Sequence, residues 1–206
     1  MSNVVLLLAA ALTAVMAKGE ETFTFASWNI GHFALGKDNK THVTPEEATT
    51  KGFAYRRFLE TVDADILGVA EHYDAFTTDG VVRADAAVFA RYGRRIVGPR
   101  HDWQWNAQFF GIGEVIDSRG KEYEKHLQHV YYIATRVRIF GEEVVFVETH
   151  LDWGTCYDGH EDDRASQMRE LIADFKDEKR VVIAGDFNVG IRSKDRSVKT
   201  IDNPAE

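Results

Sequence analysis

The segment Val181-Val182-Ile183-Ala184-Gly185-Asp186-Phe187-Asn188 shows how this chain is organised, because a short apolar run changes abruptly to polar residues. The run Val181–Ala184 is rich in β-branched residues, which is typical of a strand covered on both faces. Asp186 and Asn188 follow where the strand ends and a loop begins. A strand end is a rigid support, so polar side chains placed there are held in a fixed geometry suited to binding or catalysis.

Other apolar runs end in a polar residue in the same way. Thr22–Trp28 ends at Asn29, Ile66–Ala70 ends at Glu71, and Val144–Thr149 ends at His150. Carboxylates bind hard cations such as Mg²⁺, amides bind phosphate oxygens, and histidine transfers protons. A single Asp before a turn, or a single His after a strand, is more often structural. Their occurrence together at several strand ends predicts a site for phosphate chemistry with a divalent cation.

Helical periodicity separates the predicted strands, over Phe53–Val62 and Arg164–Lys176. The predicted core-facing stripe of the second helix consists of Ala165, Met168, Leu171, Ile172 and Phe175. Acidic residues 161–163 precede this helix, where negative charge interacts favourably with the helix dipole. The strands His129–Phe140 and Val144–Thr149 flank a tight Gly141-Glu142 turn and form a predicted hairpin. This order of elements predicts an α/β protein built from layers of helix and sheet.

The composition is that of a globular protein with an acidic surface. The chain has 206 residues, 44% of them hydrophobic, and only 3 prolines, which excludes a disordered, collagen-like or coiled-coil chain. The net charge of −8 argues against a protein that coats nucleic acid, since such proteins carry a basic excess. Cys156 is the single cysteine, so no disulfide can form within the chain.

The first 17 residues have the pattern of a secretory signal peptide. An apolar run from Val4 to Ala17 is followed at once by Lys18, Glu20 and Glu21. The run is shorter than the roughly 20 residues that span a bilayer, although no Lys or Arg precedes it. The alternative is a short buried helix at the amino terminus. We expect residues 1–17 to be removed, residues 18–206 to form one domain, and the mature protein to be secreted or periplasmic with no stable membrane span.

Several motifs of the chain, including the strand ends described above, resemble in their order and spacing those of the endonuclease/exonuclease/phosphatase superfamily, whose members have the deoxyribonuclease-I-like fold. The matching segments are Ser27-Trp28-Asn29-Ile30, residues 64–71, Asn106-Ala107, Thr149-His150-Leu151-Asp152, the Arg164…Gln167…Leu171 helix, and Gly185-Asp186-Phe187-Asn188. The resemblance covers Phe23 to Asn188 and implies a four-layer α/β sandwich, two packed β-sheets flanked by helices. It also implies a catalytic cleft at one edge, where the strand ends meet.

The resemblance also implies roles for individual residues. Glu71 would bind Mg²⁺ or Mn²⁺, with help from Asn29 at the metal or the phosphate. His150 would act as an acid or phosphate ligand, and Asp186 would orient or deprotonate the attacking water. Asn188 would hold a phosphate oxygen, and Asp152 would line the substrate cleft.

One element of the family pattern is missing from the sequence. The family ends in a Ser-Asp-His element on a last strand, several dozen residues after Gly-Asp-Phe-Asn, whereas this sequence ends at Glu206. We therefore expect a domain that is incomplete at its C-terminal end. Such a sheet lacks its last strand or strands and has an unpaired edge, and the fragment would be inactive or poorly stable.

Three functional hypotheses follow from the residues and the resemblance. The first is a secreted metal-dependent phosphoesterase, which hydrolyses a phosphodiester or phosphomonoester by in-line attack of water. The second is a secreted nuclease, and the third is a catalytically inactive member that serves as a binding module. Nucleic acid, phospholipid, inositol phosphate and sugar phosphate all stay open as substrates, and the sequence predicts no oligomeric state.

Two polar or aromatic groups bear on the choice of substrate. The basic group Arg91, Arg94, Arg95 and Arg100 is the densest in the chain, and we favour a solvated surface loop over a patch that tracks phosphates. Trp103 and Trp105 lie in a predicted loop, where they would either stack on a base, sugar or lipid or anchor the loop to the core.

Overall fold

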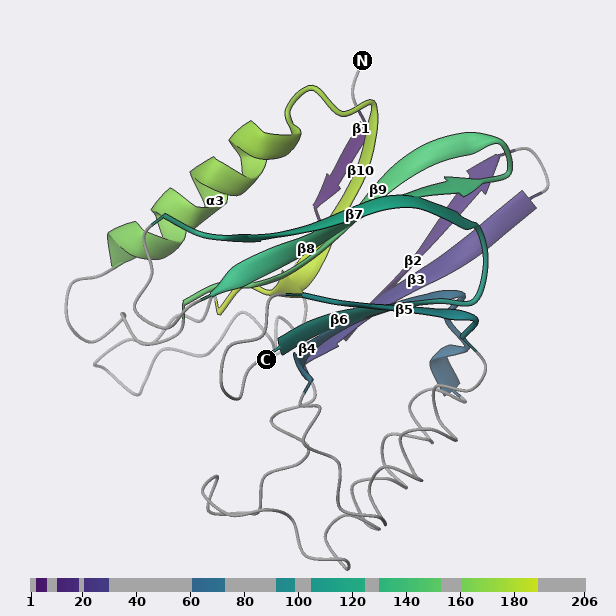
Figure 1. Cartoon of the computed structure of the whole chain (residues 1–206), viewed down its shortest axis with the longest axis horizontal. Coiled ribbons are helices and arrows are strands. Elements are labelled where there is room, and N and C mark those ends of the chain that lie inside the picture. The colour runs from purple at the N-terminus through teal and green to yellow at the C-terminus, as the bar shows by residue number, and fades with distance from the viewer. Residues whose placement is uncertain are drawn as a thin grey trace, which may run out of the picture.

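The described part of the chain forms two β-sheets packed face to face, with one helix on the outside. It comprises residues 3–6, 11–18, 21–29, 61–72, 92–98, 105–124, 130–152 and 161–188 of a computed structural model. Each sheet has five strands, in the orders β1-β10-β9-β8-β7 and β2-β3-β4-β6-β5. Helix α3, Glu161–Phe175, lies against the outer face of the first sheet (Figure 1). The predicted α/β sandwich is therefore confirmed.

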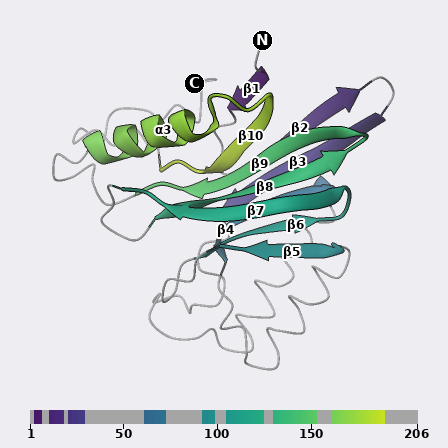
Figure 2. The same cartoon turned by 45° about the horizontal axis from the view of Figure 1, so that its top comes forward.

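The two sheets, called A and B below, are both mixed. The strands of sheet A are β1 Asn3–Leu6, β7 Glu114–Glu122, β8 Tyr131–Ile139, β9 Glu142–His150 and β10 Arg180–Asp186. Those of sheet B are β2 Ala11–Lys18, β3 Glu21–Asn29, β4 Ile66–His72, β5 Arg94–Val97 and β6 Trp105–Phe110. The pairs β9–β10 and β3–β4 are parallel, whereas β7–β8–β9 and β4–β6–β5 pair antiparallel (Figure 2).

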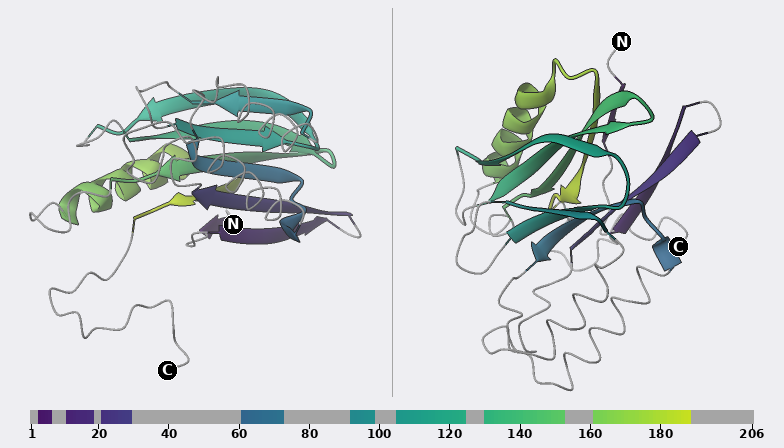
Figure 3. Two further views of the ribbon diagram at one scale, coloured as in Figure 1. Left: turned by 90° about the horizontal axis from the view of Figure 1, so that it is seen from below. Right: turned by 45° about the vertical axis from the view of Figure 1, so that its right-hand side comes forward.

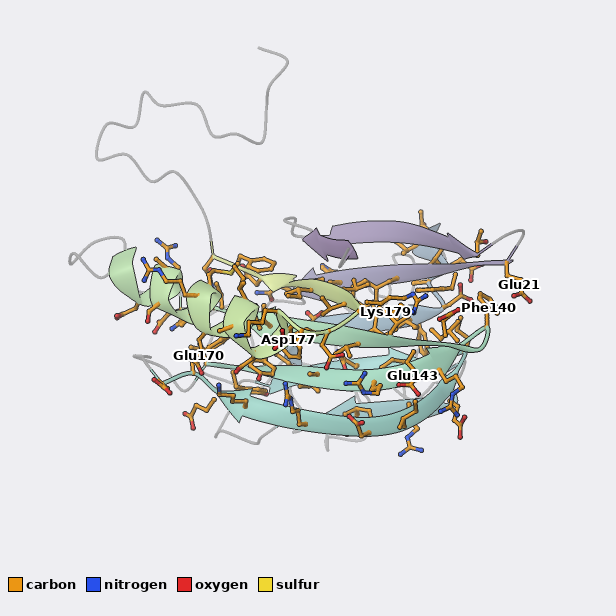
Figure 4. The ribbon with its side chains drawn as sticks, turned by 90° about the horizontal axis from the view of Figure 1, so that it is seen from above. Glu21, Phe140, Glu143, Glu170, Asp177 and Lys179 are labelled. Atoms are coloured by element: carbon orange, nitrogen blue, oxygen red, sulfur yellow. The ribbon has the colours of Figure 1, made fainter. Side chains whose placement is uncertain are left out.

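The parallel pairs bring four strand ends to one edge of the sandwich. In sheet A, Asp186 at the end of β10 pairs with His150 at the end of β9. In sheet B, Asn29 at the end of β3 pairs with Ala70 of β4. Figure 4 labels Glu21 and Phe140 at the opposite end, where β3 begins and the β8–β9 hairpin turns. The predicted meeting of the strand ends is thus confirmed for β3, β4, β9 and β10.

Two apolar clusters hold these layers together. Between the sheets, the rings of Phe23 and Phe25 lie 5.8 and 5.4 Å from that of Phe146. Behind sheet A, Leu171 and Phe175 of α3 pack on a face of β9 and β10 that includes Val147, Val181 and Ile183. Each large side chain buried in this way contributes about 1.5–3 kcal/mol. The stacking of the layers is visible from below and from the side in Figure 3.

Several details differ from the sequence predictions. The hairpin turn is Phe140-Gly141, one residue earlier than predicted, because both residues have positive φ (50° and 76°), as a two-residue type I′ turn requires. Helix α3 begins at Glu161, so the acidic residues form its first turn. Ala165 and Ile172 are exposed rather than core-facing, because the buried stripe runs through Gln167, Leu171 and Phe175.

Two segments predicted as loops are strands. Arg94 and Arg95 belong to β5, the edge strand of sheet B, and Trp105 is the first residue of β6. Charged residues are common on edge strands because they discourage pairing with other chains, so the basic pair does not indicate a loop. Arg91, Arg100, Trp103, and most of the predicted Phe53–Val62 helix lie outside the described residues.

The amino-terminal segment also differs from its prediction. Residues 3–6 pair parallel with β10, and residues 11–18 pair antiparallel with β3, so both extend the sheets as edge strands. The segment was expected to lie outside the fold. Its apolar, valine-rich sequence suits a strand added to an open sheet edge as well as it suits a signal peptide. Removal of residues 1–17 stays a prediction.

Within the described residues, no helix is long and apolar enough to cross a membrane.

Candidate active site

Four polar side chains from both sheets converge at the edge where the strands end. One ligand atom each of Glu71, His150 and Asp186 lies within 4.8 Å of the others. The Asn29 amide donates hydrogen bonds to Glu71 Oε1 (2.9 Å) and to Asp186 Oδ2 (2.7 Å). His150 Nε2 lies 3.8 Å from Glu71 Oε1 and 3.9 Å from Asp186 Oδ2. The sequence-predicted core of the site is therefore assembled in the structure.

Strand alternation explains how three of these side chains meet. Side chains two residues apart point to the same face of a strand. Phe146 lies in the core between the sheets, so His150, four residues later, is on the same inner face of β9. By the same spacing from Phe25, Asn29 is on the inner face of β3. Asp186 follows Val182 and Ala184 on the inner face of β10. The inner faces of both sheets thus carry apolar residues at their centre and the site at their end.

Glu71 reaches the site by an irregularity in its strand. By simple alternation Ala70, the register partner of Asn29, takes the inward position, and Glu71 would point away. The β4–β6 pairing shifts between Val69 and His72, and Glu71 has a positive φ of 55°. A bulge of this kind turns a side chain toward the other face of the sheet. Such strain in a non-glycine residue is concentrated at functional sites.

Glycine is required where β10 reaches the site. Gly185 has a φ of +137°, and a Cβ at this position would lie 1.8 Å from the backbone oxygen of Thr149. Only glycine combines this conformation with so close an approach to β9. The Gly-Asp pair therefore brings Asp186 alongside His150.

The loops beyond the strand ends are tied to each other and to α3. Asn188, with a positive φ of 48°, donates from its side chain to the Leu151 carbonyl (2.7 Å) and from its backbone to Asp186 Oδ1 (2.8 Å). From α3, Arg164 donates to the Asn188 carbonyl, and Gln167 accepts from the Asp152 backbone N–H (3.1 Å). The first half of α3 thereby holds the residues that follow both His150 and Asp186.

A buried carboxyl group lies directly beneath this site. Glu148, two residues before His150, is 0% exposed, and its Oε1 accepts a hydrogen bond from Ser27 Oγ of sheet B (2.9 Å). Burial raises the pKa of Glu148 well above its usual range, the Ser27 hydrogen bond opposes this, and the charge of Asp186 adds to it. Sequence reasoning missed Glu148 and Ser27 as partners, because the alternation of each strand gives no information about contacts between sheets.

The other sequence-predicted residues fall around this centre. Asp152 is fully buried directly after β9, and Asn188 is partly buried after β10. The roles predicted for both in substrate binding stay predictions. Arg94 and Arg95 pair with Phe110 and Phe109, at the end of sheet B away from Glu71. They do not form part of the site.

The donor set fits a hard divalent cation. Glu71 and Asp186 offer carboxylate oxygens and His150 offers an imidazole nitrogen, all within 4.8 Å of one another. Mg²⁺ and Mn²⁺ prefer oxygen ligands, and Mg²⁺ typically uses one or two carboxylates and keeps several waters, so the fit rests on the two carboxylates with His150 beside them. The residues therefore suit the cation that the sequence resemblance implies.

Comparisons with known proteins extend this picture. No family model and no curated protein matches the sequence. Solved structures match the fold: a truncated Caenorhabditis elegans TDP2 (18% identity, 88% of this chain and 67% of that chain, TM-score 0.61), Danio rerio TDP2 complexed with a single-strand DNA product (15%, 80% and 60%, 0.62), and the mannosyl-6-phosphatase Bt3783 of Bacteroides thetaiotaomicron (15%, 84% and 67%, 0.63).

The chain has the fold of the endonuclease/exonuclease/phosphatase superfamily. The resemblance predicted from the sequence motifs is thereby confirmed at the level of the fold. The chain spans 60% of the matched D. rerio TDP2 and 48% of another C. elegans TDP2 structure.

Proposed function

We propose that this protein is a divalent-cation-dependent phosphoesterase that hydrolyses a phosphodiester or phosphomonoester by in-line attack of water. The observation that carries the proposal is the convergence of Glu71, His150 and Asp186, bridged by Asn29, at one edge of the sandwich. Two carboxylates, an imidazole and an amide are the groups that phosphate hydrolysis needs for binding a cation and moving protons.

Each side chain has a role that its contacts support. Asp186 orients the attacking water and accepts its proton, because Asn29 and the Asn188 backbone N–H hold both of its oxygens in place. His150 donates a hydrogen bond or proton toward the phosphate oxygens, from a side chain that is only 6% exposed. A bound Mg²⁺ or Mn²⁺, held mainly by Glu71 with Asn29 beside it, would supply Lewis-acid stabilisation of the developing charge.

The substrate-binding roles of Asn188 and Asp152 are part of the same proposal. Asn188 holds a phosphate oxygen with the side-chain amide that also contacts Leu151. Asp152 supports the substrate site beside His150 from a fully buried position, with its backbone N–H held by Gln167.

The substrate class is proposed at two levels. TDP2 bound to a DNA product and a mannosyl-6-phosphatase share this fold, which supports both diester and monoester substrates for the chain. The narrower alternative, a nuclease, is favoured by the TDP2 complex. The net charge of −8, and the position of Arg94 and Arg95 away from the site, favour a substrate smaller than a long nucleic acid.

Hydrolysis assays separate these possibilities. Purified protein is assayed with bis-p-nitrophenyl phosphate and p-nitrophenyl phosphate in Mn²⁺, then in EDTA, and then on a panel of nucleic acids, phospholipids, inositol phosphates and sugar phosphates. We expect Mn²⁺-dependent hydrolysis that His150→Ala lowers at least about 10²-fold. Mn²⁺ binding without hydrolysis of any substrate would instead support a binding module.

We also propose that the protein is exported after cleavage behind Ala17. The apolar run Val4–Ala17, followed by charged residues, supports this proposal. Expression of the intact chain in a bacterial host, followed by mass spectrometry of the periplasmic and cytoplasmic fractions, tests it. Export predicts a mature amino terminus at Lys18, and an intact Met1 in a cytoplasmic protein would refute it.

A further inference from the structure

The inner faces of the two sheets are arranged in three matching rows. In sheet A, β10 and β9 pair Val182 with Phe146, Ala184 with Glu148, and Asp186 with His150. In sheet B, β3 and β4 pair Phe25 with Ile66, Ser27 with Gly68, and Asn29 with Ala70. The first row is apolar and the third holds the site. The middle row contains the fully buried Glu148.

The middle row is built around the Glu148 carboxyl group. Its Oε1 accepts from Ser27 Oγ at 2.9 Å, a contact between residues 121 positions apart and in different sheets. Among the described residues its Oε2 has no hydrogen-bond partner, and it lies over Gly68, where a Cβ would come within 1.9 Å of it. Any residue other than glycine at position 68 would displace the carboxyl group.

We propose that Glu148 is a positioning residue, which fixes His150 of sheet A relative to Asn29 and Glu71 of sheet B through its hydrogen bond with Ser27. This inference rests on the proposed function. Ser27 lies two residues before Asn29, and Glu148 lies two residues before His150, so the bond joins the two strands one row beneath the site.

The need for such a tie follows from the composition of the site. His150 and Asp186 belong to sheet A, whereas Asn29 and Glu71 belong to sheet B, so the distances between them depend on how the sheets are positioned. Apolar contacts resist sliding only weakly because they are not directional. A buried hydrogen bond is directional, and leaving one partner unpaired in the core is costly.

Another buried tie between the sheets provides a matched control. Thr135 Oγ1 of β8 donates to Gln108 Oε1 of β6 at 2.5 Å, and both side chains are 0% exposed. This bond also joins sheet A to sheet B. Its strands, β8 and β6, are not among β3, β4, β9 and β10, which carry the pairs Asn29–Ala70 and Asp186–His150. Thr135→Val removes the hydroxyl group with little change of shape.

The experiment compares Ser27→Ala, Glu148→Leu, Glu148→Gln, Gly68→Ala and Thr135→Val with the wild-type protein. For each folded variant, kcat and KM for a p-nitrophenyl phosphate ester in Mn²⁺, Tm, and Mn²⁺ affinity by calorimetry are measured. A misplacement of about 1 Å costs as much as ~10²-fold in turnover. We therefore expect Ser27→Ala, Glu148→Leu and Gly68→Ala to lower kcat at least about tenfold with little change in KM.

The control variants distinguish positioning from stability. Thr135→Val lowers Tm but keeps the wild-type kcat, because its tie joins β8 to β6, and neither of these strands carries Asn29, Glu71, His150 or Asp186. Glu148→Gln keeps an oxygen that accepts from Ser27 and restores most of the turnover that Glu148→Leu loses. Equal losses of kcat in Thr135→Val and Ser27→Ala would overturn the proposal, as would a wild-type kcat in Ser27→Ala and Gly68→Ala.

A second readout works whether or not the protein hydrolyses the ester. The ¹⁵N shift of His150 Nε2 is sensitive to hydrogen bonding and to nearby charge, and the carboxylates of Glu71 and Asp186 lie 3.8 and 3.9 Å from it. We expect Ser27→Ala to change this shift and Thr135→Val to leave it unchanged. An unchanged shift in Ser27→Ala overturns the positioning role alone. A wild-type protein that neither binds Mn²⁺ nor hydrolyses any ester overturns the proposed function instead.

Discussion

Asp186→Asn is the substitution that most directly separates the chemistry of the site from its architecture. Asp186 Oδ1 accepts from the Asn188 backbone N–H (2.8 Å), and Oδ2 accepts from the Asn29 side chain (2.7 Å). An asparagine keeps the first bond through its oxygen. Its amide nitrogen would then face the Asn29 nitrogen, so two donors would meet at a distance that suits a donor and an acceptor.

The effect on stability is expected to be moderate. One hydrogen bond to a charged group contributes about 1.5–3 kcal/mol, and Asn29 recovers part of this by turning its oxygen toward the new amide. Turning Asn29 breaks its bond to Glu71 Oε1 (2.9 Å). Removal of one of two neighbouring carboxylates lowers their repulsion and offsets some of the loss. We expect the free energy of unfolding to fall by about 1–2 kcal/mol.

The effect on turnover is expected to be much larger. General acid–base groups contribute about 10²–10⁴-fold, and the amide cannot accept the proton of the attacking water. The assay is hydrolysis of a p-nitrophenyl phosphate ester in saturating Mn²⁺, with the folded fraction of each variant measured by circular dichroism. Asn188→Ala, which removes the bond to the Leu151 carbonyl and the predicted phosphate contact but keeps the backbone bond to Asp186 Oδ1, is the comparison. Turnover in Asp186→Asn within threefold of wild type would refute the assignment of Asp186 as the base.

Three further outcomes are expected. Glu71→Gln weakens Mn²⁺ binding at least about 10-fold in calorimetry with little change in Tm, and unchanged affinity would remove Glu71 from the metal site. Gly185→Ala forces a Cβ onto the Thr149 backbone and lowers Tm strongly in a thermal melt; a wild-type Tm would show that β9 and β10 can separate. Burial raises the pKa of Asp174, but hydrogen bonds from Lys121 and Tyr132 outweigh it, so the net pKa lies below its usual value. The free energy that this carboxylate contributes to folding is therefore present above its unfolded pKa of about 4 and is lost as the pH falls further. In urea unfolding, the free energy of unfolding of Asp174→Asn should fall less between neutral and acid pH than that of the wild type.

Local patterns along the chain were sufficient to predict the strands β3, β9 and β10 and the residues at their ends. Short runs rich in aromatic or β-branched residues that stop at Asn29, His150 and Asp186 are visible in the sequence. The two-residue period of a strand then places these residues on a single face. The edge strands β5 and β7 were not predicted, because their exposed, charged residues resemble those of loops and their pairing partners are distant in sequence.

The tertiary structure decides the direction of the Glu71 side chain and the contacts between the two sheets, which no single segment of the sequence predicts. Glu71 points into the site because a bulge in the β4–β6 pairing gives it a positive φ, which depends on the neighbouring strand and not on its own sequence. Asn29 meets Asp186 across 157 positions, and Ser27 meets Glu148 across 121, because the two sheets pack face to face. Strand propensity and alternation act over a few residues, so they predict which side chains share a face. Packing between the sheets decides which faces meet and in what register. The contacts that stabilise this packing join groups far apart in the chain, so no local pattern contains them.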